Sequence, residues 1–213
     1  MSPRPTLGHI RRPQILQAAI ETMYARGFAE TRISDIAERA GTSSATVLYY
    51  FESKDVLLEE ALGDSDERFY AALKEEMAAL DSPSARLVHL IESCTAPAQA
   101  LDDWTLWIEM WLQARHRPHM RPTYEGLERR LRALIADVVR EGQRAGEFGP
   151  ADADDVATAL SAMLDGLGVQ VTLEHPDVTP ERMVHLCLTT ASLQLGRELQ
   201  PTAMSGTANG RLT

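Results

Sequence analysis

Residues that can contact a nucleic acid are concentrated between positions 42 and 54. This segment combines small hydroxyl side chains, two tyrosine phenols and one lysine ammonium group. Such groups, together with backbone N–H groups, contact phosphates and base edges in protein–DNA complexes. The residues concerned are Thr42, Ser43, Ser44, Thr46, Tyr49, Tyr50 and Lys54. The segment therefore predicts a surface that binds double-stranded DNA.

Two short helices must position these groups. The spacing of apolar residues predicts one helix over about 33–40 and another over about 44–50, separated by Gly41. Two short helices around a glycine-containing turn match the helix-turn-helix pattern, in which the second helix lies in the major groove. Small side chains at Ser44 and Ala45 would allow that helix to approach DNA closely. The two tyrosines have an alternative role, which is to cover a small core.

All three tryptophans of the chain lie on one predicted helical face. Trp104, Trp107 and Trp111 are spaced i, i+3 and i+7, as expected for one side of a helix. Two interpretations stay open, because the stripe is either a packed aromatic core or the wall of a ligand pocket. In the second interpretation, ring faces near Glu109 or Asp165 suit a hydrophobic or cationic small molecule, since a cation over a ring gains roughly 0.5–2 kcal/mol.

No catalytic group, cofactor or metal site is predicted. The sequence has none of the phosphate-loop, dinucleotide-binding, zinc-protease or nucleophile-elbow patterns. His116 and His119 flank a proline that prevents a regular helical metal face, and the acidic run at 152–155 is expected to cap a helix. Cys94 and Cys187 lack metal-type spacing. An all-helical enzyme and a helical adaptor remain alternatives to a DNA-binding regulator, and a steep salt-dependent affinity for duplex DNA distinguishes the regulator from the adaptor.

The rest of the chain also has the periodicity of helices, and strand-like alternation is nearly absent. An all-α protein of about nine helices is therefore predicted. Pro13 is expected in the first turn of the first helix and Pro97 at the end of the fifth, while Ser53 and Asp152 are expected as helix caps. The remaining helices are predicted over about 12–26, 54–80, 83–91, 101–115, 121–145, 152–173 and 179–199.

The charge is unevenly distributed over the 213 residues. The net charge of −10 argues against a general nucleic-acid binder, but positions 1–54 carry seven basic and five acidic residues, so that the excess of acids lies in the remainder. A weakly basic head on an acidic body is expected if only the head approaches a polyanion. Because the chain lacks an apolar run of bilayer length and a signal-peptide pattern, a cytoplasmic protein without membrane association is expected.

The first quarter of the chain carries a set of residues typical of a known family. They are Ala18-Ala19, Gly27-Phe28, the run from Ser34 to Gly41, Ser43, Thr46, Val47, Tyr50-Phe51 and the run from Ser53 to Asp55. In these residues the chain resembles the TetR-type transcriptional repressors. The resemblance implies a three-helix DNA-binding head over 9–55, a helical ligand-binding and dimerisation body over 56–199, and a disordered tail over 200–213. It also implies that the seven residues at 42–54 named above touch operator phosphates or bases.

Three residues depart from the family's pattern. Leu48 stands where many members have tyrosine, and Ala45 replaces the usual glycine. Arg32 occupies the position of the residue that normally caps the second helix, so the cap must come from Thr31 or be lost. Arg32 is then free to reach a phosphate and joins the predicted DNA-binding set.

The body resembles the BetI-like branch of the family through residues 140–148, 164–167 and 179–182. The resemblance implies that the sixth helix borders an inducer cavity, formed by Trp104, Trp107, Glu109, Trp111 and Asp165. Two apolar stripes near the end of the chain either pack internally or, as the resemblance favours, form a two-fold dimer interface. The interface residues would be Leu160, Met163, Leu164, Leu167, Val171, Met183, Leu186, Thr190 and Leu193. The function implied is a homodimeric repressor that a small-molecule effector releases from a palindromic operator.

Overall fold

The computed structural model describes residues 7–95 and 97–202 of the chain. Within these residues there are nine α-helices, one short 3-10 helix and no β-strand. The prediction of an all-α protein with about nine helices is therefore confirmed. The predicted disordered tail over 200–213 lies largely outside the described residues.

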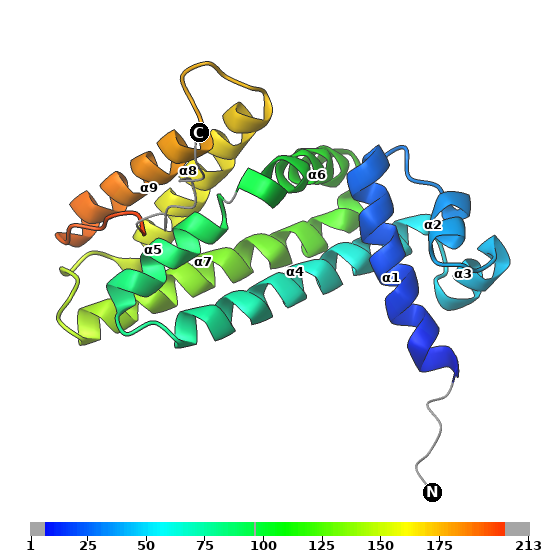
Figure 1. Ribbon diagram of the computed structural model, residues 1–213, viewed down its shortest axis with the longest axis horizontal. Coiled ribbons are helices and arrows are strands. Elements are labelled where there is room, and N and C mark those ends of the chain that lie inside the picture. Colours follow the sequence, from blue (N-terminus) through cyan, green and yellow to red (C-terminus); the bar gives the residue numbers. More distant parts are fainter. Residues whose placement is uncertain (1–6, 96, 203–213) are drawn as a thin grey trace, which may run out of the picture.

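The helices form a head at one end of an elongated molecule and a helical body at the other (Figure 1). Their bounds are α1 (Leu7–Arg26), α2 (Ile33–Arg39), α3 (Ser44–Tyr50), α4 (Lys54–Ala78), α5 (Pro83–Ser93), α6 (Pro97–His116), η1 (Pro118–Met120), α7 (Arg121–Arg144), α8 (Ala153–Thr172) and α9 (Pro180–Leu195). Helices α1 to α3 make the head. The long helices α4 and α7 run side by side through the molecule, and α5, α8 and α9 lie at the far end (Figure 1).

The helix starts follow local capping chemistry. Ser53 accepts a hydrogen bond from the N–H of Val56 at the start of α4 (3.2 Å), and Asp152 accepts two from the first turn of α8, as predicted. Two prolines were predicted wrongly. Helix α1 begins at Leu7, so Pro13 lies inside it, where its ring supplies no N–H to the hydrogen bonds of the helix. Pro97 opens α6 instead of closing α5. The N–H groups of the first helical turn have no acceptor within the helix, so the missing N–H of proline costs nothing at this position.

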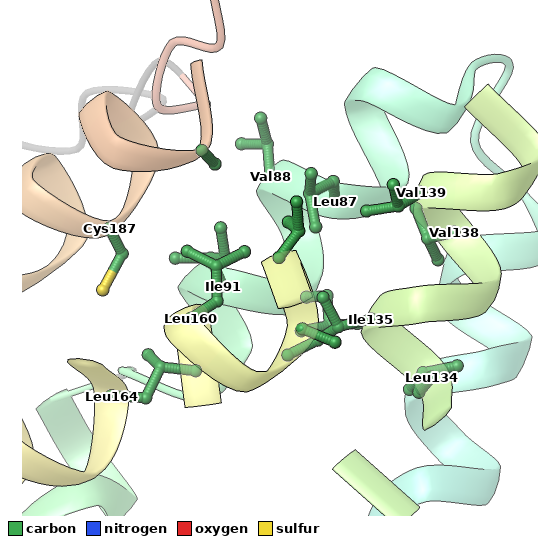
Figure 2. Close-up of a cluster of buried hydrophobic side chains, with 14 of the residues drawn as sticks. Leu87, Val88, Ile91, Leu134, Ile135, Val138, Val139, Leu160, Leu164 and Cys187 are labelled. Carbon is green, nitrogen blue, oxygen red and sulfur yellow. The ribbon is translucent and has the colours of Figure 1, made fainter. Parts of the chain in front are cut away.

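Two hydrophobic cores hold the fold together. The body core is built mainly by α5, α7, α8 and α9, with Tyr70, Leu73 and Met77 added from α4. Figure 2 shows its centre, where side chains of α5, α7, α8 and α9 converge. Its labelled members are Leu87, Val88, Ile91, Leu134, Ile135, Val138, Val139, Leu160, Leu164 and Cys187. The head core joins α1 to α4 and also takes Leu106 and Met110 from α6 and Leu127 from α7. Helix α6 therefore belongs to both halves of the molecule, with Trp104 in the body core.

Candidate DNA-binding surface and effector cavity

Helix α3 turns its polar side to solvent at the edge of the head. The hydroxyl of Ser43 accepts a hydrogen bond from the N–H of Thr46 (3.1 Å) and so fixes the first turn. Val47, on the opposite side, is completely buried in the head core. The exposed residues of the turn and helix are Ser43, Ser44, Ala45, Leu48 and Tyr49. Small side chains at the start of α3 and one aromatic ring near its end are thus exposed on the second helix of a helix-turn-helix.

The two tyrosines of α3 differ in their surroundings. Tyr49 is 83% exposed, whereas Tyr50 is half-buried and packs against the head core. Their rings meet edge to face with centroids 5.3 Å apart. Tyr49 is therefore the one of the pair that a DNA duplex would meet first, and Tyr50 supports it.

Two arginines of α1, which the sequence analysis did not single out, adjoin this surface. Arg11 donates a hydrogen bond from Nη1 to Oγ1 of Thr42 (2.9 Å), and both residues lie beside the turn before α3. The guanidinium of Arg12 lies over the ring of Phe51, 4.9 Å from its centroid, and pairs with Glu60. Their proximity depends on how α1 crosses α3 and α4, which no local sequence pattern indicates.

Lys54 is hydrogen-bonded to the backbone of the head, whereas Arg32 is exposed at its surface. The ammonium of Lys54 donates to the carbonyl oxygens of Ala29 (3.1 Å) and Thr31 (2.8 Å), so it ties the α1–α2 turn to the start of α4. Arg32 is exposed and gives α2 no side-chain cap. The hydroxyl of Thr31 donates to the Gly27 carbonyl instead. The capping hydrogen bond of α2 is thus lost, and the Arg32 guanidinium is left at the surface.

A cavity of about 690 Å³ lies between the head and the body. Five helices line it: α1, α4, α6, α7 and α8, with the end of α5 closing one side. Its wall is mainly apolar and aromatic, and includes Ile20, Tyr24, Leu62, Phe69, Tyr70, Trp104, Leu106, Trp107, Met110, Leu127, Leu131 and Leu164. We call it the central cavity. Its volume lies within the range of about 300–1,000 Å³ that is usual for small-molecule sites.

Three buried or half-buried carboxylates face the central cavity. Asp66 pairs with Arg130 (2.7 Å), and Glu128 pairs with Arg132 (3.0 Å). Asp165 has no hydrogen bond or ion pair with any other described residue. Burial raises the pKa of Asp165 to about 7, and the negative charge of Glu128 adds to the rise.

Three of the five residues predicted for the effector pocket line the central cavity, namely Trp104, Trp107 and Asp165. Trp111 and Glu109 do not, so these two predictions were wrong. Trp111 lies one further turn along α6 and packs between the two cores. The carboxylate of Glu109 turns toward the head and accepts a hydrogen bond from the N–H of Phe28. Trp111 lies on the same side of α6 as the other two tryptophans but farther along the helix, whereas Glu109 lies on a different side.

Comparison with protein families matches both halves of the chain. The family model "Bacterial regulatory proteins, tetR family" matches residues 15–61, and the model "BetI-type transcriptional repressor, C-terminal" matches residues 83–196. The chain belongs to the BetI-type branch of the TetR family. It is accordingly a helix-turn-helix transcriptional regulator, and the family is not one of enzymes.

Curated relatives and solved structures of TetR-family proteins agree with this assignment. The BetI regulator of Burkholderia thailandensis is 30% identical over 173 residues, which are 79% of this chain and 86% of the relative. A protein of Saccharomonospora viridis described as a transcriptional regulator, solved in complex with choline, is 32% identical with a TM-score of 0.79 over 88% of this chain and 98% of that one. A TetR regulator of Haloarcula marismortui is 26% identical with a TM-score of 0.75, over 90% and 100% of the two chains.

The last two helices of this TetR-family chain divide the predicted dimer residues into two groups. Leu160, Leu164, Val171 and Met183 are buried in the core of the single chain, so their prediction as interface residues was wrong. The residues left at least partly exposed are Met163, Leu167, Leu186, Thr190 and Leu193. Apolar spacing predicts a stripe, but it does not indicate whether the stripe packs within the chain or against a partner.

The part of the chain that the structure describes contains neither a metal-binding cluster nor a membrane-spanning helix. Residues 7–95 and 97–202 contain no group of three or more His, Cys, Asp or Glu side chains placed to hold a metal ion. None of their helices combines the length and the apolar character needed to cross a membrane.

Proposed function

We propose that this TetR-family regulator is a homodimeric repressor whose effector is a small organic cation bound in the central cavity. The observation that carries the proposal is Asp165, a carboxylate without an ion-pair partner among the described residues, on the cavity wall that also holds Trp104 and Trp107. Aromatic rings attract an organic cation through their faces, and the carboxylate supplies the opposite charge. The choline bound to the Saccharomonospora viridis relative is a cation of this class.

The lining as a whole favours a cation. Four acidic residues, Glu21, Asp66, Glu128 and Asp165, face the central cavity against one basic residue, Arg68. Two of these acids already have ion-pair partners, since Arg130 pairs with Asp66 and Arg132 with Glu128. An ionised Asp165 inside an apolar wall pays a desolvation cost that a bound cation relieves.

DNA binding is assigned to the exposed side of α3 and its surroundings. Thr42, Ser44, Thr46 and Tyr49 would face the major groove or the adjacent phosphates, with Tyr50 in support. Arg32 and the third N–H of the Lys54 ammonium group would reach phosphates on either side. One such helix makes few base contacts. Two heads about 34–36 Å apart would reach successive major grooves of a palindromic operator.

The exposed side of α8 and α9 is assigned to dimerisation. Leu193 is 80% exposed on α9, and Thr190 and Leu186 precede it by about one and two turns on the same helix. Met163 and Leu167 stand one turn apart on α8. An isologous four-helix contact between two copies would bury this surface. Effector binding then releases the operator by favouring a spacing of the two heads that no longer fits the half-sites, which requires the effector to bind that state more tightly.

Selection of duplex fragments on the purified chain tests the DNA-binding part of the proposal. We expect enrichment of a palindrome with half-sites one helical turn apart. Arg32→Ala should weaken binding to the recovered operator, whereas Lys74→Ala, which removes an equal charge from an exposed position on α4, should not. Equal loss in the two variants, or no enriched palindrome, would contradict the proposed surface.

Quenching of tryptophan fluorescence tests the effector site. Trp104 and Trp107 report on occupation of the central cavity, so choline and related organic cations should change the emission. The Asp165→Asn variant, which keeps the shape of the side chain and loses its charge, should bind the same cations at least tenfold more weakly. Full affinity in that variant would remove Asp165 from the site.

A further inference from the structure

The central cavity extends from the body into the DNA-binding head. At its inner end, Asp165 and Leu164 of α8 adjoin Trp104, whose indole packs so closely on Gly168 that no side chain fits there. At its outer end, Ile20 and Tyr24 of α1 form the wall. One wall of the cavity is thus a helix of the head itself.

Helix α6 spans the distance between the two ends. Trp104 lies against α8, whereas Met110 belongs to the head core together with residues of α1. These residues are six positions apart on one helix, which corresponds to about 9 Å along its axis. A compact cation held at Asp165 would therefore leave the outer part of the cavity unfilled.

The passage between the two ends is lined by apolar side chains. Leu62, Leu106, Trp107, Leu127 and Leu131 contribute to it from α4, α6 and α7. The two carboxylates nearby, Asp66 and Glu128, have arginine partners. A hydrocarbon chain suits such a passage, because each buried methylene group strengthens binding by up to about fourfold.

We infer that the effector is an extended amphiphilic monocation, with its ammonium group at Asp165 and Trp104 and its hydrocarbon tail running along α6 to Ile20 and Tyr24. The inference rests on the proposed cation site and adds the tail. The tail fills the space against α1, so it transmits occupation of the cavity directly to the head.

Isothermal titration of the full chain, below the micelle concentration of each compound, tests the inference. Three probes are compared. Choline has the cationic group without a hydrocarbon tail, octanesulfonate has the tail with a negative group, and octyltrimethylammonium has both the cationic group and the tail. We expect octyltrimethylammonium to bind at least tenfold more tightly than choline and octanesulfonate not to bind. Tyr24→Ala, which trims the wall at the α1 end of the cavity, should weaken binding of octyltrimethylammonium several-fold and leave choline unchanged. Leu112→Ala, which trims an exposed apolar residue of α6 outside the cavity, should change neither affinity.

The outcomes distinguish the tail from the cation site. If choline and octyltrimethylammonium bind equally and both depend on Asp165, the tail inference fails and the proposed function stands. If neither cation binds, the proposed effector class fails as well. If octyltrimethylammonium binds tightly but Asp165→Asn does not weaken it, or if octanesulfonate binds equally well, the tail is held without the proposed orientation and the inference is overturned.

Discussion

The carboxylate of Glu109 accepts a hydrogen bond from the backbone N–H of Phe28 and so joins the helix that lines the cavity to the DNA-binding head. Glu109 lies on α6 between Trp107 and Met110, both of which face the central cavity. Phe28 follows the last turn of α1 and is buried in the head core. A shift of α6 on effector binding would therefore move the turn that leads into the helix-turn-helix.

Removal of this contact should separate effector binding from DNA release. In Glu109→Ala the N–H of Phe28 loses its acceptor, which costs about 1–3 kcal/mol for a buried donor, and the melting temperature should fall. The affinity for the effector should stay unchanged, while the effector concentration needed to release operator DNA should rise. Glu109→Gln keeps an acceptor oxygen and should restore most of the response. An unchanged release curve for Glu109→Ala would show that α6 acts on the head by another route.

A side chain at position 27 should destabilise the protein for two reasons. The φ of +84° at Gly27 is unfavourable for a side chain, and an added Cβ would lie 2.6 Å from Oε1 of Glu109. The flexible Glu109 side chain can retreat, but only by giving up the hydrogen bond to Phe28. We expect Gly27→Ala to lower the free energy of unfolding by more than Gly146→Ala. Gly146 has a similar φ of +73° and open space around it, so it measures the cost of the backbone conformation alone.

A double-mutant cycle checks this explanation. If the added methyl group acts by displacing the Glu109 carboxylate, then Gly27→Ala and Glu109→Ala should be clearly less than additive in urea denaturation. Additive losses would mean that the strain of Gly27→Ala lies in the backbone only.

The local features of this chain were predictable from sequence, whereas the partners of its side chains were not. Helix α3 has its predicted bounds, and the caps at Ser53 and Asp152 form as expected, because capping depends on neighbours within three residues. Glu109 was assigned to the effector pocket, yet its partner is 81 positions away in the sequence. Leu160 and Leu164 were assigned to a dimer, yet they fill the core of one chain. Contacts of this kind depend on how helices pack, which apolar spacing leaves undetermined.

Effector affinity should depend on pH through Asp165. Burial and the charge of Glu128 raise its pKa to about 7, against the opposing charge of Arg132. The cation needs the ionised form, so its affinity should be constant well above pH 7 and fall toward tenfold per unit below it. The step near pH 7 should disappear in Asp165→Asn. Titrations between pH 5.5 and pH 8.5 test this, and a flat profile for the unmodified chain would contradict the assignment. Asp66, whose pKa burial raises to about 6, would add a weaker second step.

Dimerisation should depend on the exposed side of α9. Leu193→Arg places a charge at an 80% exposed position that cannot disturb the core of the single chain. It should convert the dimer to a monomer in analytical ultracentrifugation and abolish tight operator binding, since one head alone makes few base contacts. Leu112→Arg makes the same exchange at an exposed position on α6 and should leave the dimer intact. A dimer that withstands Leu193→Arg would place the interface elsewhere.

Lys54 should contribute to both stability and DNA affinity. Two of its three N–H donors are used by the carbonyl oxygens of Ala29 and Thr31, so one remains for a phosphate. Lys54→Ala should therefore lower the melting temperature and also reduce the slope of log K against log salt by about 0.9, the value for one lost phosphate contact on duplex DNA. Arg32→Ala removes an exposed cation without a cap or carbonyl partner, so it should reduce the slope by a similar amount without changing the melting temperature. If Lys54→Ala lowers stability but leaves the salt slope unchanged, Lys54 only holds the α1–α2 turn, and the phosphate contacts of the head must come from Arg32 and its neighbours.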